Sequence, residues 1–277
     1  MTQKSILITG CSSGIGYDAA HTLHRRGWRV FATCRKEADC ERLRGEGLES
    51  FVLDYSDESS ISDAISETLS RTGGTLDAVF NNGAFAQPGA VEDIPRDAMR
   101  AIFEANLFGY HDVIRQIMPV MRAQGHGRIV NCSSILGLVA ARYRGPYNAT
   151  KFALEALTDT LRLEIQGTNI HPILIEPGPI TTDIRKKARP QFERWIGVEG
   201  SAHRKVYEKA LIPRLYDEDS TPDKFELPPS AVTNKLIHAL EAKRPKARYF
   251  VTTPTYLSDI LRRILPTRLL DKVLMAG

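Results

Sequence analysis

The feature that most restricts the fold is a glycine-rich loop near the start of the chain. A short apolar run, Ser5 to Thr9, has the composition of a buried strand, and a helical pattern extends from Tyr17 to Arg26. Between them stands the loop, Gly10-Cys11-Ser12-Ser13-Gly14-Ile15-Gly16, with the spacing G-x3-G-x-G. A strand, a glycine-rich turn and a helix in this order are typical of a dinucleotide-binding unit.

Each part of this loop has a physical task in binding phosphate. Gly10 permits a tight turn, while Gly14 and Gly16 let the backbone approach a phosphate group. The start of the following helix supplies unpaired N–H groups and the positive end of the helix dipole. We therefore expect the loop to hold a dinucleotide through Gly10, Ser12, Ser13, Gly14, Ile15 and Gly16.

The rest of the first 175 residues repeats the alternation of strand and helix. Apolar runs predict further strands over 29–33, 49–54, 76–80, 128–132 and 170–175, and a seventh over 247–251. Helices are predicted over 56–71 (with an N-cap at Ser56 or Asp57), 96–122 (with a break near Gly109), 147–166 and 228–243. This rhythm predicts an α/β protein with a doubly wound parallel sheet of about seven strands.

A tyrosine and a lysine at the start of the helix predicted over 147–166 carry the chemistry. Tyr147 and Lys151 are four residues apart and so share one helix face. A phenol has a reference pKa near 10, and a nearby fixed positive charge should lower the pKa of Tyr147 toward the range useful for proton transfer. Ser134, just after the strand over 128–132, can donate a hydrogen bond to the substrate oxygen that Tyr147 would protonate. An ordinary amphipathic helix would explain Tyr147 and Lys151 equally well.

The end of the second predicted strand bears on the choice of dinucleotide. An acidic residue there favours NAD, and an arginine accommodates the 2′-phosphate of NADP. Here Cys34 is followed by Arg35 and Lys36, with no acid. Arg35 therefore favours NADP(H), and the alternative is a solvated basic loop end.

The character of the chain changes after Thr182. Residues 184–227 are irregular, with a basic first part, an acidic second part and aromatics that include Phe192, Trp195 and Tyr207. An insertion of this length is usually a functional lid.

Two short amphipathic helices, over 256–265 and 267–274, follow the last strand in a tail over 254–277 that is basic overall. We favour packing of its leucines against the lid, the sheet edge or a second copy over contact with an anionic membrane surface. The whole of 1–277 is expected to form one domain.

Composition excludes several classes of protein. Hydrophobic residues make up 42% and charged residues 25%, which is ordinary for a globular protein. A net charge of +4 gives no argument for binding to nucleic acid.

The four cysteines lack metal-ligand spacing, and we expect reduced thiols in a cytoplasmic protein. His21 and His24 find no third metal ligand, so no metal site is expected. The chain leaves no room for a signal peptide before Ile6, and it has no apolar run long enough to span a membrane.

Taken together, these motifs resemble the short-chain dehydrogenase/reductase family in its non-extended form. The resemblance covers residues 5–183 well and the rest loosely. It rests on a set of motifs in the family's order and spacing: Thr9-Gly10-x3-Gly14-x-Gly16, Asn81-Asn82, Asn106, Ser134, Tyr147-x3-Lys151 and Pro177-Gly178. The branch it most resembles comprises retinol and hydroxysteroid dehydrogenases and bacterial aldehyde reductases.

The resemblance implies a Rossmann-type fold, a nicotinamide cofactor and a role for each matching residue. Tyr147 would be the general acid/base, and Lys151 would bind the nicotinamide ribose and lower the pKa of Tyr147. Ser134 would hold the substrate oxygen, and Asn106 would place a water in a proton relay. Contacts with the adenine side are expected from Asp54 and Asn81, and with the nicotinamide side from Pro177, Gly178, Ile180 and Thr182.

One departure from the family pattern affects the fourth strand end. The family usually has Asn-Asn-Ala-Gly, whereas this chain has Asn81-Asn82-Gly83-Ala84, which moves the flexible position by one residue.

The leading hypothesis is an NADP-dependent oxidoreductase acting on a small apolar carbonyl or alcohol, as a homodimer or homotetramer. A non-catalytic NADP(H)-binding regulator would not need the intact set of Ser134, Tyr147, Lys151 and Asn106. An epimerase or dehydratase of the extended type would have another glycine spacing and usually a longer chain.

Overall fold

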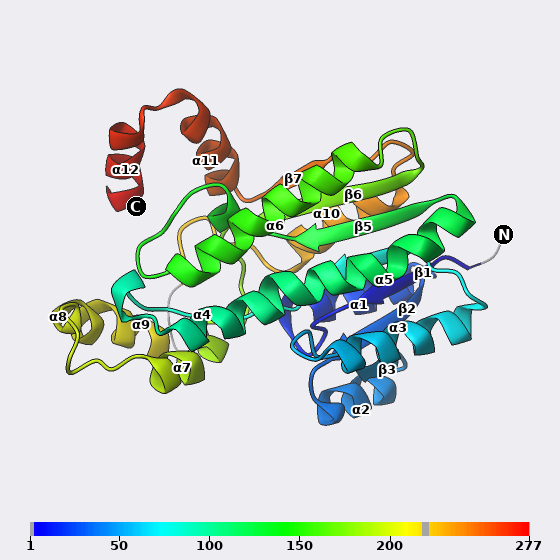
Figure 1. The fold of residues 1–277 in the computed structure, drawn as a ribbon, viewed down its shortest axis with the longest axis horizontal. Coiled ribbons are helices and arrows are strands. Elements are labelled where there is room, and N and C mark those ends of the chain that lie inside the picture. Colours follow the sequence, from blue (N-terminus) through cyan, green and yellow to red (C-terminus); the bar gives the residue numbers. More distant parts are fainter. Residues whose placement is uncertain (1–2, 218–221, 277) are drawn as a thin grey trace.

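The computed structural model describes residues 3–217 and 222–276, which form a parallel sheet of seven strands with helices on both faces (Figure 1). The strand order is β3-β2-β1-β4-β5-β6-β7. Strands β2 and β3 are therefore added on one side of β1, and β4 to β7 on the other. The predicted doubly wound sheet and all seven predicted strands are confirmed. The strands are β1 Ser5–Ile8, β2 Arg29–Cys34, β3 Glu49–Val52, β4 Ala78–Asn81, β5 Gly127–Cys132, β6 Ile170–Pro177 and β7 Arg248–Val251.

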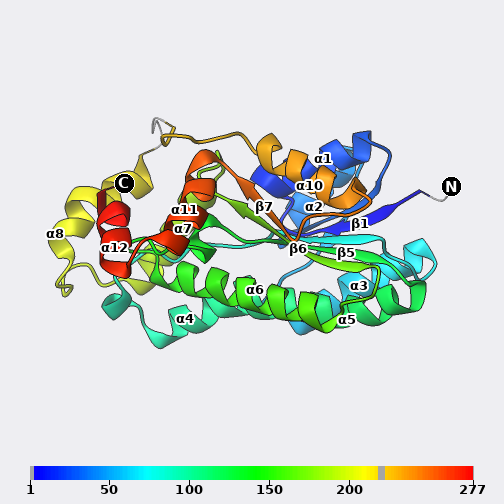
Figure 2. The same ribbon diagram turned by 90° about the horizontal axis from the view of Figure 1, so that it is seen from above.

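The helices lie in two layers, one on each face of the sheet (Figure 2). One layer consists of α1 Gly14–Arg25, α2 Glu37–Gly45 and α10 Ser230–Glu241. The other consists of α3 Glu58–Thr72, α4 Arg96–Phe103, α5 Gly109–Gln124 and α6 Gly145–Glu164. Helix α2 was not predicted, although its Cys40 and Leu43, three residues apart, are its buried residues.

The apolar strands supply both layers because successive side chains point to opposite faces. In β1, Ile6 and Ile8 join the core under α1, α2 and α10, whereas Leu7 joins the core under α3, α5 and α6. All three side chains are fully buried. This two-sided burial explains why the strands are continuously apolar rather than alternating.

The predicted break near Gly109 is instead a wide helical turn that keeps α4 and α5 continuous. Residues Glu104–Phe108 form a π-type turn, in which the Gly109 N–H bonds to the carbonyl of Glu104. Gly109 is needed because a Cβ there would lie 2.4 Å from Cβ of Tyr55. The N-cap of α3 is Asp57, whose carboxylate accepts from the N–H groups of Ser59 and Ser60.

Residues 184–217, here called the α7–α9 segment, form a small cluster of their own beside the sheet. The segment comprises α7 Ile184–Trp195, α8 Arg204–Val206, a wide turn Tyr207–Leu211 and α9 Ile212–Tyr216. Phe192 and Tyr207 are buried in this cluster rather than displayed to a substrate. The hydroxyl of Tyr207 also accepts from the Ala90 N–H at 2.8 Å, which attaches the segment to the loop after β4. The predicted insertion extends to 227, and its residues 218–221 lie outside the described part of the chain.

The tail consists of α11 Thr253–Ile264 and α12 Thr267–Ala276, which project from the end of β7 (Figure 1). The expectation that its apolar side chains pack on the lid or the sheet edge is wrong for most of them. Thr255 and Asp259 are the buried residues of α11, so the apolar stripe faces outward. The exposed apolar side chains are Tyr256, Leu257, Ile260, Ile264, Leu269, Val273 and Met275. Contact with a second copy stays a prediction. Within the described residues no helix has the length and apolar character to cross a membrane.

Candidate active site

The predicted site residues gather at the carboxyl ends of β1, β4, β5 and β6. Because all strands are parallel, the loops that follow them meet at one edge of the sheet, where ligands bind in such folds. Gly10 lies against Gly83, since a Cβ on Gly10 would be 2.6 Å from Gly83 Cα. Gly14 lies against Thr182, whose Cγ2 would be 3.1 Å from a Cβ on Gly14. Loops distant in sequence thus form one surface.

The glycine loop has the conformation that its spacing predicted. Gly10 and Gly14 have φ angles of 70° and 61°, which disfavour other residues. Ser13 is the N-cap of α1 but makes no side-chain capping bond, and the first turn holds no acid. The free amide groups and the dipole at the start of α1 therefore suit an anionic diphosphate. A Cβ at Gly14 would narrow the space where that diphosphate would lie. These residues fit a dinucleotide.

Gly16 has a packing task, and its approach to phosphate stays a prediction. A Cβ there would lie 2.4 Å from the carbonyl oxygen of Gly10 and 2.7 Å from Nδ2 of Asn82. Gly16 therefore lets α1 pack tightly against the loop and the end of β4.

A buried chain of hydrogen bonds joins the glycine loop to α6 across the sheet. Thr9 Oγ1 and the Tyr55 hydroxyl are 2.6 Å apart, and Tyr55 donates to Asn81 Oδ1 at 2.9 Å. Asn81 Nδ2 donates to Asn131 Oδ1, and Asn131 Nδ2 donates to Thr158 Oγ1, both at 2.9 Å. The Asn81 amide is fully buried and bonded to these partners, and a contact of Asn81 with the adenine side stays a prediction.

At the Gly83-Ala84 departure from the family pattern, Gly83 is needed for lack of room rather than for a special backbone conformation. Gly83 does not have a positive φ. A Cβ there would lie 3.2 Å from Cε2 of Tyr55, which is closer than ordinary contact. Asn82 holds this turn onto the glycine loop by donating to the carbonyl of Thr9 at 3.0 Å.

Lys151 is almost entirely buried, with 1% of its surface exposed. Its Nζ donates to the carbonyl of Cys132 at 2.8 Å and lies 5.4 Å from the ring centroids of both Tyr110 and Tyr147. Burial lowers the pKa of Lys151 to about 8, against the opposing influence of Cys132 and Glu155. The side chain is therefore mainly an ammonium at neutral pH, beside the Tyr147 ring.

Tyr147 lies next to Lys151 as predicted, but its pKa shifts in the other direction. Burial raises the pKa of Tyr147 above its ordinary value, Cys132 adds to the rise, and a hydrogen bond with Ser134 opposes it. The Lys151 ammonium, which donates to the Cys132 carbonyl, does not reverse this shift of the Tyr147 pKa. Tyr147 is consequently a protonated phenol at neutral pH.

Ser134 connects the ends of β5 and β6. Its Oγ accepts from the Leu136 N–H at 3.1 Å, which caps the short 3-10 turn Ile135–Gly137, and lies 3.5 Å from the carbonyl of Pro177. Gly178, which follows, has no room for a side chain, since a Cβ would lie 2.2 Å from Thr252 Oγ1. Ser134 and Pro177-Gly178 therefore lie together at the ends of β5 and β6.

Asn106 is fully buried in the wide turn between α4 and α5. It accepts from the Phe85 N–H at 3.1 Å, donates to the Phe85 carbonyl at 2.9 Å, and Nδ2 lies 3.5 Å from Thr150 Oγ1. Its side chain thus fixes the loop after β4 beside α6, and the placing of a water by Asn106 stays a prediction.

The remaining predicted residues lie around this centre. Arg35 is exposed directly after β2, and Asp54 lies beyond β3 with its carboxylate accepting from the Ser56 N–H at 3.0 Å. Ile180 forms a bridge with Leu227 and packs on the core, and Thr182 contacts the Gly14 region. The structure does not bring Arg35 or Asp54 into contact with Tyr147.

An ionic cluster behind α6 was not predicted. Arg248 of β7 pairs with Glu155, with Glu176 at 2.5 Å and with Asp159 at 2.6 Å. Burial raises the pKa of Glu176 to about 9, and Glu155 adds to the rise. Glu155 stands four residues after Lys151, and this helical spacing is the signal that would have revealed it.

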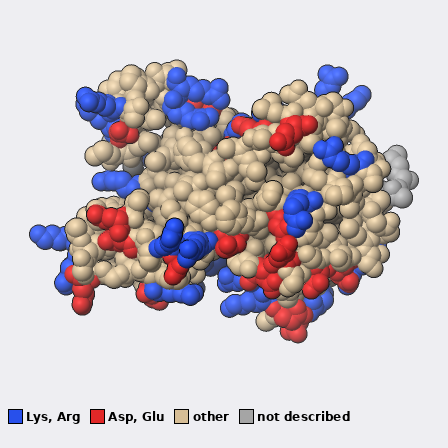
Figure 3. Space-filling view, in the orientation of Figure 1, with Lys and Arg blue, Asp and Glu red and all other residues tan. Residues whose placement is uncertain are grey.

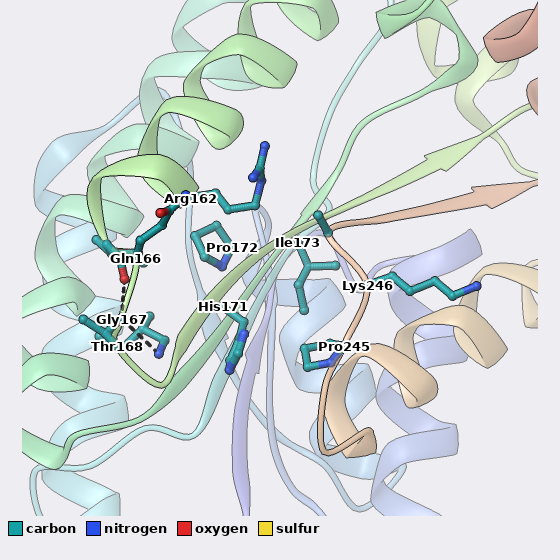
Figure 4. Close-up of a pocket in the computed structure, with 12 residues that line it drawn as sticks. Arg162, Gln166, Gly167, Thr168, His171, Pro172, Ile173, Pro245 and Lys246 are labelled. Atoms are coloured by element: carbon teal, nitrogen blue, oxygen red, sulfur yellow. Dashed lines mark hydrogen bonds between the residues drawn. The ribbon is translucent and has the colours of Figure 1, made fainter.

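A hollow elsewhere on the surface lies at the opposite edge of the sheet. It is lined by residues at the start of β6, the end of α6 and the turn before β7, including His171, Gln166 and Lys246 (Figure 4). Since Tyr147 and Lys151 are at the start of α6, this hollow is remote from them. No group of histidine, cysteine or acidic side chains in the described chain could hold a metal ion.

Comparison with known proteins agrees with this geometry. Residues 4–193 match the family model described as short chain dehydrogenase. The chain is 39% identical to the uncharacterized oxidoreductase YbbO of Escherichia coli K12, covering 98% of this chain and 94% of the relative. It is 32% identical to mouse retinol dehydrogenase 16 (99% and 88%) and 29% identical to the NADPH-dependent 3-dehydrocapnine reductase of Ornithobacterium rhinotracheale (96% and 94%).

A solved structure shares the fold over nearly the whole chain. A short-chain dehydrogenase from Streptomyces avermitilis superimposes with a TM-score of 0.78 at 27% identity, covering 98% of this chain and 94% of that one. The chain belongs to the short-chain dehydrogenase/reductase family of NAD(P)-binding oxidoreductases, which act on small substrates.

Proposed function

We propose that this protein is an NADP-dependent oxidoreductase that interconverts an apolar carbonyl compound and its alcohol. The observation that carries the proposal is the convergence of Ser134, Tyr147 and the buried Lys151 ammonium beside a dinucleotide cradle. The protein orients the reacting groups and holds the proton, and the nicotinamide, when bound, supplies or takes the hydride.

Tyr147 is the group that gives the proton to the substrate oxygen. Its raised pKa keeps the phenol protonated at neutral pH, which suits a general acid for carbonyl reduction. Ser134 holds the substrate oxygen, and Lys151 places a positive charge beside the Tyr147 ring. In the reverse direction the same group, as a phenolate, would take the proton from the alcohol.

The choice of NADP rests on the end of β2. Arg35 is exposed there, and no acidic residue stands at that position. The 3-dehydrocapnine reductase relative is NADPH-dependent, which supports the same choice.

The substrate is proposed to be apolar, in keeping with the name of the retinol dehydrogenase relative. The α7–α9 segment would act as the lid over it. Because Phe192 and Tyr207 are buried inside this segment, they would stiffen the lid rather than touch the substrate.

The test is a panel of straight-chain aldehydes and ketones of increasing length, each assayed with NADPH and with NADH. We expect consumption of NADPH with a kcat/KM at least about tenfold higher than with NADH, corresponding to one charge-assisted contact with the 2′-phosphate. The kcat/KM should also rise with chain length. Equal values for the two cofactors would remove the NADP assignment, and binding of NADPH without consumption of it would favour a non-catalytic regulator.

A further inference from the structure

A lysine from the α7–α9 segment contacts the glycine loop. Lys187 of α7 donates from Nζ to Ser13 Oγ at 2.7 Å and to Ser12 Oγ at 3.3 Å. These serines lie in the loop that is proposed to bind the dinucleotide, at the other end of the sequence. The contact therefore brings a cation from the proposed lid onto the cofactor site.

One arginine contacts this loop from the side of β2, and a second arginine follows the end of that strand. The Cys11 N–H donates to the Thr33 carbonyl at 2.9 Å, so the loop runs beside the end of β2, where Arg35 follows. Arg42 of α2 donates to the carbonyl of Ser12 at 2.7 Å. Cations from α7 and α2 thus contact Ser12 and Ser13, and Arg35 follows the strand end beside which this loop runs.

These cations differ in how far their charge is already neutralised. Arg42 pairs with Glu46 at 3.0 Å and lies 3.9 Å from Asp39, with its guanidinium over the ring of Tyr17. By contrast, neither Arg35 nor Lys187 forms an ion pair with a carboxylate in the described part of the chain. The neutral hydroxyls that Lys187 contacts are weaker partners than a phosphate dianion would be.

We propose that Lys187 binds the 2′-phosphate of NADP(H) together with Arg35, so that the lid closes on the phosphorylated cofactor. This inference rests on the proposed function. A phosphate oxygen takes the place of a serine hydroxyl as the acceptor from Nζ, and the lid then senses which dinucleotide is present.

The 2′-phosphate is favoured over the diphosphate by position. The cradle for a diphosphate is at Gly14 and the first turn of α1. Ser12 and Ser13 precede it on the side of β2, the strand end at which the adenosine ribose is read in this fold.

The test compares two fragments that differ only in the 2′-phosphate, namely 2′,5′-ADP and 5′-AMP. Calorimetry measures their binding to the wild type, Lys187→Ala, and Lys186→Ala, which removes a neighbouring exposed lysine of the same helix. We expect Lys187→Ala to weaken 2′,5′-ADP about five- to tenfold, as for one charge-assisted contact, and to change 5′-AMP less than about twofold. Lys186→Ala should change neither, and Lys187→Arg should retain the tighter binding of 2′,5′-ADP.

Equal weakening of both fragments by Lys187→Ala, or no weakening, would overturn the inference. A wild type that binds 2′,5′-ADP no better than 5′-AMP would instead refute the NADP assignment itself, so the two failures are distinguishable. Thermal unfolding of each variant checks that the fold is kept.

Closure of the lid has its own readout. In the wild type, NADPH should protect residues 184–217 from proteolysis more strongly than NADH does, and Lys187→Ala should abolish the difference. Equal protection by the two cofactors in the wild type would contradict a lid that senses the 2′-phosphate.

Discussion

Helix α6 and the tail helices differ in which of their side chains face the protein interior. On α6, Lys151 and Glu155 point into the protein, and Arg248 of β7 joins them through Glu155. On α11 and α12 the apolar side chains face outward instead, between Lys and Arg that appear as blue areas on the upper left lobe of Figure 3. Both stretches have helical periodicity, so periodicity identifies a helix but does not decide which of its faces is buried.

The difference follows from what each helix packs against. Helix α6 lies along β5 and β6, and so its inward charges must be paired inside the protein. Helix α11 presents Thr255 and Asp259 inward, and Asp259 is paired with Arg262 and Arg263 at 3.1 Å. Charges near α6 should therefore matter greatly, and those in the tail should matter little.

The largest expected effect is that of Lys151→Met, which keeps length and removes the buried charge. Turnover should fall about 10²- to 10⁴-fold, the usual contribution of general acid–base groups, because proton transfer at Tyr147 loses its cationic neighbour. NADPH binding should weaken as well, measured by fluorescence titration. Turnover close to that of the wild type would mean that the buried charge on α6 is structural only.

The next effect is on stability, from Arg248→Met. Leaving the Glu155 carboxylate buried without its cation should cost about 3 kcal/mol at pH 8, where Glu176, with a pKa of about 9, is already mostly protonated. The loss should be smaller at pH 5, because burial raises the pKa of Glu155 and this acid takes up a proton more readily in the folded state as the pH falls. Urea unfolding at the two pH values measures this.

Arg263→Met in the tail is the matched control for that variant. Arg263 pairs with Asp259 at 3.1 Å but is 63% exposed, so its removal should cost less than about 1 kcal/mol. Similar losses for Arg248→Met and Arg263→Met would contradict the contrast between the two regions.

The smallest effect is expected from truncation after Leu265, which removes α12. Its apolar residues Leu269, Val273 and Met275 are exposed, so little buried surface is lost. The midpoint of thermal unfolding should fall by less than about 4 °C, which corresponds to about 1 kcal/mol in a protein of this size, and turnover should be kept. Loss of folded protein would show that a second copy covers the stripe.

The sheet and most of the site were predictable because their signals are local. The strand before Gly10 and the spacing of Tyr147 and Lys151 depend on neighbours a few residues away. The direction of the pKa shift of Tyr147 was not predictable, because it is set by burial in the folded protein, which the spacing of Tyr147 and Lys151 does not report. Likewise, Lys187 meets Ser13, and Arg248 meets Glu155, only through the tertiary fold.

The most direct test of the account is hydride transfer in Tyr147→Phe, with NADPH that carries two deuterium atoms at nicotinamide C4 and with the best aldehyde of the panel. In the wild type, mass spectrometry should find one deuterium on the carbinol carbon of the alcohol. The variant should bind NADPH as tightly but form labelled alcohol at least about 10²-fold more slowly, because the phenol that protonates the oxygen is gone. Labelled alcohol formed at the wild-type rate by Tyr147→Phe, or alcohol without deuterium in the wild type, would contradict the proposed mechanism.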